Sequence, residues 1–162
     1  MHYSKMYPIP LPMVAGRLSI VSRPRGGDWL EDDMAALHQC QVTTLVSLLE
    51  PPEAAELGLA LEGRWAECSG MKFVNLPLPD RSIPNTRVNV SKAANGLSAS
   101  IRLGESVAVQ CRQSVGRSSL LTVLILRALG VGIQSAIQAV GAARGVEVPE
   151  TPEQLAWLMA TP

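Results

Sequence analysis

The chain has 162 residues, a length that predicts a single domain, and 47% of them are hydrophobic, which excludes an intrinsically disordered protein. Its 14 Lys and Arg residues balance its 14 Asp and Glu residues, and no apolar run reaches the ~20 residues of a membrane span, so neither nucleic acid nor a membrane is expected as a partner. Three widely spaced cysteines argue against a disulfide framework and a four-ligand zinc site, so we expect a cytoplasmic protein that needs no metal or other cofactor.

The predicted strands and helices alternate along the chain. Roughly residues 1–16, which contain three prolines, are expected to form an extended segment. The patterns that follow predict, in order, a strand at 18–21, a helix at 29–39 that Asp28 caps, a strand at 42–49, a helix at 53–68, a strand at 72–78, a loop at 79–84, a helix at 90–103, a strand at 106–110 and helices at 118–129, 133–144 and 152–159. This alternation predicts one α/β domain with a central, mainly parallel sheet and helices on both of its faces.

The most informative segment is the short polar loop between the strand at 106–110 and the helix at 118–129. A loop in this setting points its backbone N–H groups and the positive end of the helix dipole into one small cavity that suits a phosphate dianion. The same field stabilises a thiolate, so Cys111 at the start of the loop is predicted to be a nucleophile. Arg117 is predicted to hold two phosphate oxygens through its guanidinium, and Ser118 to donate a hydrogen bond to the sulfur.

Cys111, five intervening residues, Arg117 and Ser118 resemble the phosphate-binding loop of the cysteine-dependent protein tyrosine phosphatases. The size of the chain and the loop at 79–84 look most like the dual-specificity branch of that superfamily. The resemblance implies a tyrosine-phosphatase-like fold, with residues 1–162 as one phosphatase domain and Asp80 as the general acid. It also implies phosphate contacts from the loop residues, namely Arg112, Gln113, Ser114, Val115, Gly116 and Arg117.

The resemblance further implies an activity and a substrate class. The expected reaction is hydrolysis of phosphate monoesters on a phosphorylated protein or peptide, through a cysteinyl-phosphate intermediate on Cys111. Phosphotyrosine is the first candidate substrate, and phosphoserine or phosphothreonine is the second. The sequence leaves the physiological substrate and the oligomeric state open.

Two positions depart from the family pattern. Gln110 stands where the family usually has His, and it brings no titratable positive charge to the thiolate. Ser114 stands where the family usually has Gly, at a point where a tight loop demands an unusual backbone angle. Reduced activity, and not its loss, is what these departures imply.

Other interpretations of the same residues remain open. A pseudophosphatase would bind phosphorylated ligands without turnover, and a rhodanese-like sulfurtransferase also places a cysteine at the start of such a loop, although its loop is typically one residue shorter. Cys111 would otherwise be a buried structural cysteine, Asp80 a turn residue between two prolines, and Ser118 an ordinary residue of the first helical turn.

Overall fold

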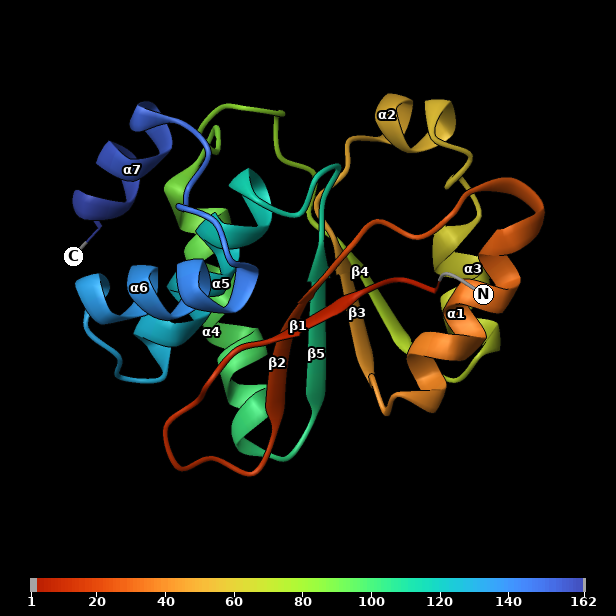
Figure 1. Cartoon of the computed structure of the whole chain (residues 1–162), viewed down its shortest axis with the longest axis horizontal. Coiled ribbons are helices and arrows are strands. Elements are labelled where there is room, and N and C mark those ends of the chain that lie inside the picture. Colours follow the sequence, from red (N-terminus) through yellow and green to blue (C-terminus); the bar gives the residue numbers. More distant parts are fainter. Residues whose placement is uncertain (1–2, 162) are drawn as a thin grey trace.

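The computed structural model describes residues 3–161, and a five-stranded sheet forms its centre. The strands are β1 Met6–Pro8, β2 Arg17–Val21, β3 Thr44–Ser47, β4 Lys72–Asn75 and β5 Ser106–Gln110. They lie side by side in the order β1-β2-β5-β3-β4 (Figure 1). β1 is antiparallel to β2, and all other neighbours are parallel. The predicted mainly parallel sheet is therefore confirmed.

Helices cover both faces of the sheet, as predicted (Figure 1). They are α1 Leu30–Gln39, α2 Pro51–Glu56, α3 Glu62–Cys68, α4 Arg87–Arg102, α5 Gly116–Ala128, α6 Ile133–Arg144 and α7 Pro152–Met159, with a short 3₁₀ helix, η1, at Gly27–Trp29. α4 to α7 lie on one face, and α1 and α3 lie on the other. No helix within residues 3–161 combines the length and the apolar character that crossing a bilayer would require.

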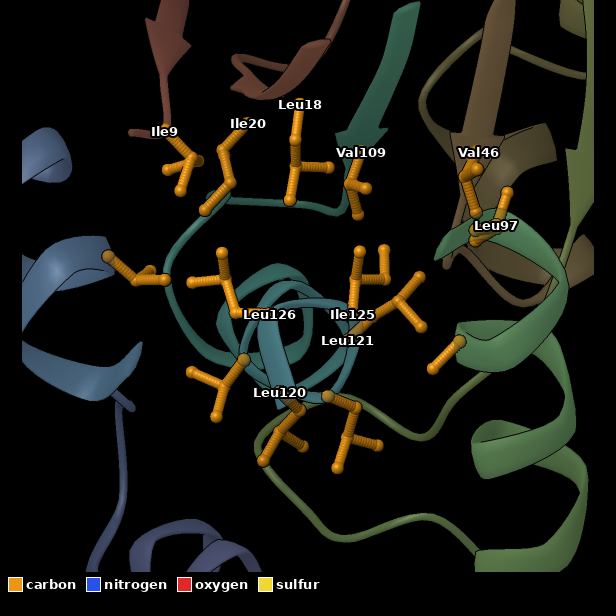
Figure 2. Packing of buried hydrophobic residues seen from close by; sticks show 14 of the residues in the cluster. Ile9, Leu18, Ile20, Val46, Leu97, Val109, Leu120, Leu121, Ile125 and Leu126 are labelled. Atoms are coloured by element: carbon orange, nitrogen blue, oxygen red, sulfur yellow. The ribbon is translucent and has the colours of Figure 1, made fainter. Parts of the chain in front are cut away.

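α5 is the central helix of the larger core. Its buried residues pack between the sheet and the helices α4 and α6, and Figure 2 shows Leu121, Ile125 and Leu126 beneath strand residues that include Leu18 and Val109. Full burial of a side chain of this size stabilises the fold by about 1.5–3 kcal/mol. Because α5 is buried along most of its length, its first turn, next to Cys111, is held in one place.

Two local predictions were wrong. The helix predicted at 53–68 is two helices, α2 and α3, because the chain turns at Gly58 with a φ of +72°. Asp28 does not cap α1, since it lies inside η1 and the N-cap position is Trp29, with no side-chain cap hydrogen bond. The N-terminal segment, for which the sequence predicts an extended chain, contains the edge strand β1; residues 1 and 2 of that segment lie outside the described residues.

Candidate active site

The loop of residues 111–115, hereafter the Cys111 loop, joins β5 to α5 at the carboxyl edge of the parallel strands (Figure 1). Ligands of open α/β sheets bind outside this edge. Cys111 is buried, with 2% of its surface exposed. The N–H groups of residues 112–115 donate to no backbone carbonyl within residues 3–161, and the first N–H groups of a helix lack partners by geometry. The loop thus presents backbone donors at the positive end of α5, an arrangement that suits an anion.

Ser114 adopts the unusual backbone angle that the sequence predicts for this point of the loop. Its φ is +56°, in the left-handed region that glycine enters most easily. Two hydrogen bonds hold it there: the Ser114 Oγ donates to the Val21 carbonyl at 2.6 Å, and the Arg144 Nε donates to the Ser114 carbonyl at 2.7 Å. The Arg144 guanidinium also lies 3.9 Å from the centre of the Tyr7 ring. These contacts offset the strain that a non-glycine residue brings to the loop.

Arg117 is a buried cation held by a carboxylate that the sequence analysis missed. With only 1% of its surface exposed, it donates from Nη1 and Nη2 to the two carboxylate oxygens of Glu53, both at 2.8 Å. Nη1 also donates to the carbonyls of Leu78 at 3.0 Å and Leu48 at 3.3 Å. Glu53 lies on α2, 64 residues before Arg117 in the chain. No local sequence pattern predicts an ion pair between residues so far apart.

This ion pair fixes the charges of both groups. The hydrogen bond from Arg117 is the largest reason why the pKa of the Glu53 carboxyl lies below its ordinary value. Burial lowers the pKa of Arg117, but the hydrogen bond to Glu53 and the electrostatic interactions with Cys111, Glu53 and Asp80 outweigh it, so the pKa is raised. Arg117 therefore stays positively charged, within electrostatic reach of the Cys111 sulfur.

Two buried donors next to the Cys111 loop have no protein partner. Arg117 Nε and Ser118 Oγ are both buried and form no hydrogen bond within the described residues. Ser118 does not cap α5, whose N-cap residue is Val115 with no side-chain cap bond. A buried donor without a partner costs about 1–3 kcal/mol, so an anion that accepts from these groups would be stabilised. The hydrogen bond from Ser118 to the sulfur stays a prediction.

Asp80 lies across from the Cys111 loop, on the loop of residues 79–84, hereafter the Asp80 loop. Its Oδ1 is 3.1 Å from Arg117 Nη2 and accepts a hydrogen bond from the Arg81 N–H at 3.0 Å. The side chain is 47% exposed. The structure therefore brings Asp80 to Arg117, and the turn interaction with Arg81 is present as well.

Arg112 and Gln113 of the Cys111 loop are less buried than Cys111. Arg112 is half-buried and lies 3.9 Å from Glu53 and 3.8 Å from Glu56, and its carbonyl accepts a hydrogen bond from Arg23 at 3.3 Å. Gln113 is exposed. No group of three or more His, Cys, Asp or Glu side chains within residues 3–161 is arranged to hold a metal ion.

Comparison with known proteins identifies the fold. No protein-family model and no curated protein sequence matches the chain. Among solved structures, kinase associated phosphatase, with its catalytic cysteine replaced by serine, has a TM-score of 0.89 at 15% identity over 98% of this chain and 93% of that one. Tk-PTP in its active form has a TM-score of 0.75 at 21% identity over 94% of both chains. A putative protein tyrosine phosphatase from Leishmania major has 0.73 at 18% identity over 99% of both chains. The chain has the tyrosine and dual-specificity phosphatase fold.

Within this phosphatase fold, the residue before the cysteine is held by α3. Side chains alternate along β5, so that Val109 and Cys111 lie in the core beneath α5 and Ala108 lies in the core beneath α1. Gln110 therefore faces α3, where its Nε2 donates to Glu62 Oε1 at 2.6 Å. The Gln110 amide is thus hydrogen-bonded to a buried acid.

Glu62 is a buried carboxyl with an altered proton affinity. Only 2% of its surface is exposed. Burial raises the pKa of Glu62 to about 8, against the opposing effect of a hydrogen bond from Ser47. At neutral pH most of the folded molecules therefore carry a neutral Glu62 beside Gln110.

This carboxyl predicts a dependence of stability on pH. The folded state keeps a proton that the unfolded chain releases above the ordinary pKa of 4.5, so Glu62 should lower the free energy of unfolding as the pH rises from 4.5 to about 8. The free energy of unfolding should fall by up to ~1.4 kcal/mol per pH unit in this range. Glu62→Gln should flatten this dependence in denaturant titrations between pH 5 and pH 8. Glu67→Gln, at an exposed position of the same helix, is the control. Parallel curves for wild type and Glu62→Gln would contradict the prediction.

Proposed function

We propose that this chain is a phosphatase that hydrolyses phosphate monoesters of phosphorylated proteins or peptides through a cysteinyl-phosphate intermediate. The observation that carries the proposal is that buried Cys111, at the start of the loop before α5, lies within electrostatic reach of buried Arg117, whose Nε has no protein partner within the described residues. The phosphatase fold supports it. The five residues between Cys111 and Arg117 favour a phosphate over the smaller persulfide of a sulfurtransferase.

The first step transfers the phosphoryl group to the protein. The phosphate accepts hydrogen bonds from the N–H groups of the Cys111 loop and from Arg117, and Glu53 keeps the guanidinium oriented while it does so. The Cys111 sulfur attacks phosphorus, so that an S–P bond forms and the P–O bond to the leaving group breaks. A protonated Asp80 gives its proton to the departing oxygen.

The second step returns the enzyme to its starting state. A water molecule attacks phosphorus, the S–P bond breaks, and inorganic phosphate leaves. Asp80, now ionised, accepts the proton of the water. The Ser118 hydroxyl, which has no other hydrogen bond within the described residues, donates to the sulfur as negative charge returns to it.

Asp80 must shift during this cycle. In the free protein its Oδ1 lies 3.1 Å from Arg117 Nη2, one of the donors that a bound phosphate would use. A bound phosphate dianion competes for this guanidinium and displaces the Asp80 side chain from it. Because the Asp80 side chain is 47% exposed, its movement toward the leaving oxygen requires no repacking of the core.

A pseudophosphatase is the second candidate, and Gln110 is the observation that favours it. Its amide is committed to Glu62 and carries no positive charge that would stabilise a thiolate. The deciding experiment measures hydrolysis of p-nitrophenyl phosphate and of a phosphopeptide panel, alongside equilibrium binding of the same peptides. Steady phosphate release, with phosphotyrosine peptides preferred, supports the enzyme. Saturable binding without release of phosphate would overturn it in favour of the binding module.

Replacing Arg117 by lysine tests the guanidinium. Lysine keeps the charge but loses the planar fork, which bidentate sites do not tolerate. We expect kcat to fall by ~10²-fold, the cost of losing one donor to a developing oxyanion. Arg102→Lys, at an exposed helix end, is the control, and denaturant unfolding shows whether the Lys variant still folds. An unchanged kcat in folded Arg117→Lys would remove Arg117 from the transition state.

A further inference from the structure

The C-terminal segment before and within α7 touches both loops of the site. Gln154, fully buried, donates from Nε2 to the Ser82 carbonyl of the Asp80 loop at 3.1 Å. Glu150 accepts a hydrogen bond from Arg81 of the same loop at 2.6 Å. At Gly116, the first residue of α5, an added Cβ would lie only 2.8 Å from Glu150 Oε2 and 3.0 Å from Gln154 Nε2. The same two side chains therefore lie against the start of α5 and hold the Asp80 loop.

We propose that Gln154 and Glu150 are positioning residues that fix the Asp80 loop relative to the Cys111 loop and so place the general acid over the leaving group. This inference rests on the proposed function, because it assigns the two residues to the proton transfer from Asp80. In this proposal neither residue contacts the phosphate or the reacting atoms. Both act by holding the Asp80 loop in position.

Both the oxygen and the nitrogen of the Gln154 amide form hydrogen bonds. Its oxygen accepts hydrogen bonds from the N–H groups of Glu150 at 3.1 Å and Thr151 at 3.2 Å, which fixes the orientation of the side chain. In this orientation its nitrogen donates to the Ser82 carbonyl. Breaking a buried hydrogen bond of this kind leaves a polar group without a partner, at a cost of about 1–3 kcal/mol. The Gln154 amide therefore connects the segment before α7 rigidly to the Asp80 loop.

The helix that carries Gln154 is itself anchored. Trp157 and Leu158 of α7 are part of the core beneath the sheet, with 8% and 0% of their surfaces exposed. Asp80 and Arg81, by contrast, are exposed, and Arg81 has a φ of +51°. The part of the Asp80 loop that carries the carboxylate thus depends on contacts from outside the loop. Because a misplacement of 1 Å can cost ~10²-fold in rate, these contacts matter for catalysis.

The test distinguishes loss of the contact between Gln154 and the Asp80 loop from a general loss of stability of α7. Gln154→Met keeps the length of the side chain but removes the donor to Ser82, whereas the control Thr151→Ala removes the Thr151 Oγ1 cap of the same helix without touching the Asp80 loop. Arg81→Gln breaks the ion pair with Glu150 at the surface, and it serves as the second variant should buried Gln154→Met fail to fold. Each variant is assayed with a phosphotyrosine peptide and with p-nitrophenyl phosphate, whose leaving group needs less help from an acid.

We expect Gln154→Met and Arg81→Gln to lower kcat for the peptide by ~10-fold, to change kcat for p-nitrophenyl phosphate by less than ~2-fold, and to leave KM unchanged. In an Asp80→Asn background the same substitutions should cost nothing further, because they act through Asp80. Equal slowing of both substrates, full additivity with Asp80→Asn, or the same pattern in Thr151→Ala would overturn the proposal.

Hydrogen exchange keeps this proposal distinguishable from the proposed function. Backbone amides of residues 80–83 should exchange faster in Gln154→Met than in wild type or in Thr151→Ala, whether or not the protein is active. A wild-type protein without turnover would count against the phosphatase, whereas unchanged exchange in the Asp80 loop would count against the link.

Discussion

Cys111→Ser is expected to abolish the turnover of phosphate monoesters while leaving phosphate and vanadate binding intact. A serine hydroxyl is not ionised near neutral pH and is a weak nucleophile unless a base activates it. The anion site survives, because its donors are the N–H groups of the Cys111 loop and Arg117, which Glu53 holds in place. The measurement pairs p-nitrophenyl phosphate hydrolysis with calorimetric titration of phosphate.

The control for this experiment is Cys40→Ser, because Cys40 is an exposed free cysteine. It should leave both turnover and binding at wild-type values. Turnover of Cys111→Ser at the wild-type rate would mean that the reaction does not pass through the sulfur. Loss of phosphate binding together with loss of turnover would instead mean that the Cys111 loop no longer has its shape.

Asp80→Asn should slow poor leaving groups far more than good ones. A tyrosine phenol has a pKa of about 10, so its expulsion as a bare anion near neutrality is slow, and a positioned acid is typically worth ~10²–10⁴ in rate. Asparagine keeps the size of the side chain but has no proton to give. We expect a loss of this order with phosphotyrosine peptides and a much smaller loss with aryl phosphates of acidic alcohols.

The geometry makes this a demanding test of Asp80. The residue contacts Arg117, but it also accepts the Arg81 N–H as an ordinary turn residue would. Asp28→Asn, at an exposed position outside the site, is the control. Equal slowing of every leaving group, or no slowing at all, would leave Asp80 as a turn residue and place the acid elsewhere.

The parts of the fold that depend on local patterns could be predicted from the sequence. The apolar strand before Cys111 and the apolar run after Arg117 predicted β5 and α5, and with them the setting of the loop. The helix predicted at 53–68 was wrong because its apolar spacing continues across the turn at Gly58, although Leu61, within that spacing, is 53% exposed.

The supports of the site could not be predicted, because they come from distant parts of the chain. Glu53 pairs with Arg117 across 64 residues, and Gln154 meets Ser82 across 72. Ser114 tolerates a glycine-like φ because the Val21 carbonyl, 93 residues away, accepts its hydroxyl. Neither the periodicity of apolar residues nor the spacing of residues within a motif predicts contacts between such distant residues.

The central claim is a covalent phosphoenzyme on Cys111. Rapid acid quenching of the wild-type protein during turnover of a phosphotyrosine peptide, followed by mass spectrometry of its fragments, measures it directly. The account predicts one phosphoryl group on the fragment that contains Cys111, and none on the same fragment of Cys111→Ser. Turnover that proceeds with no phosphoryl group on Cys111, or with the group on another residue, would contradict it.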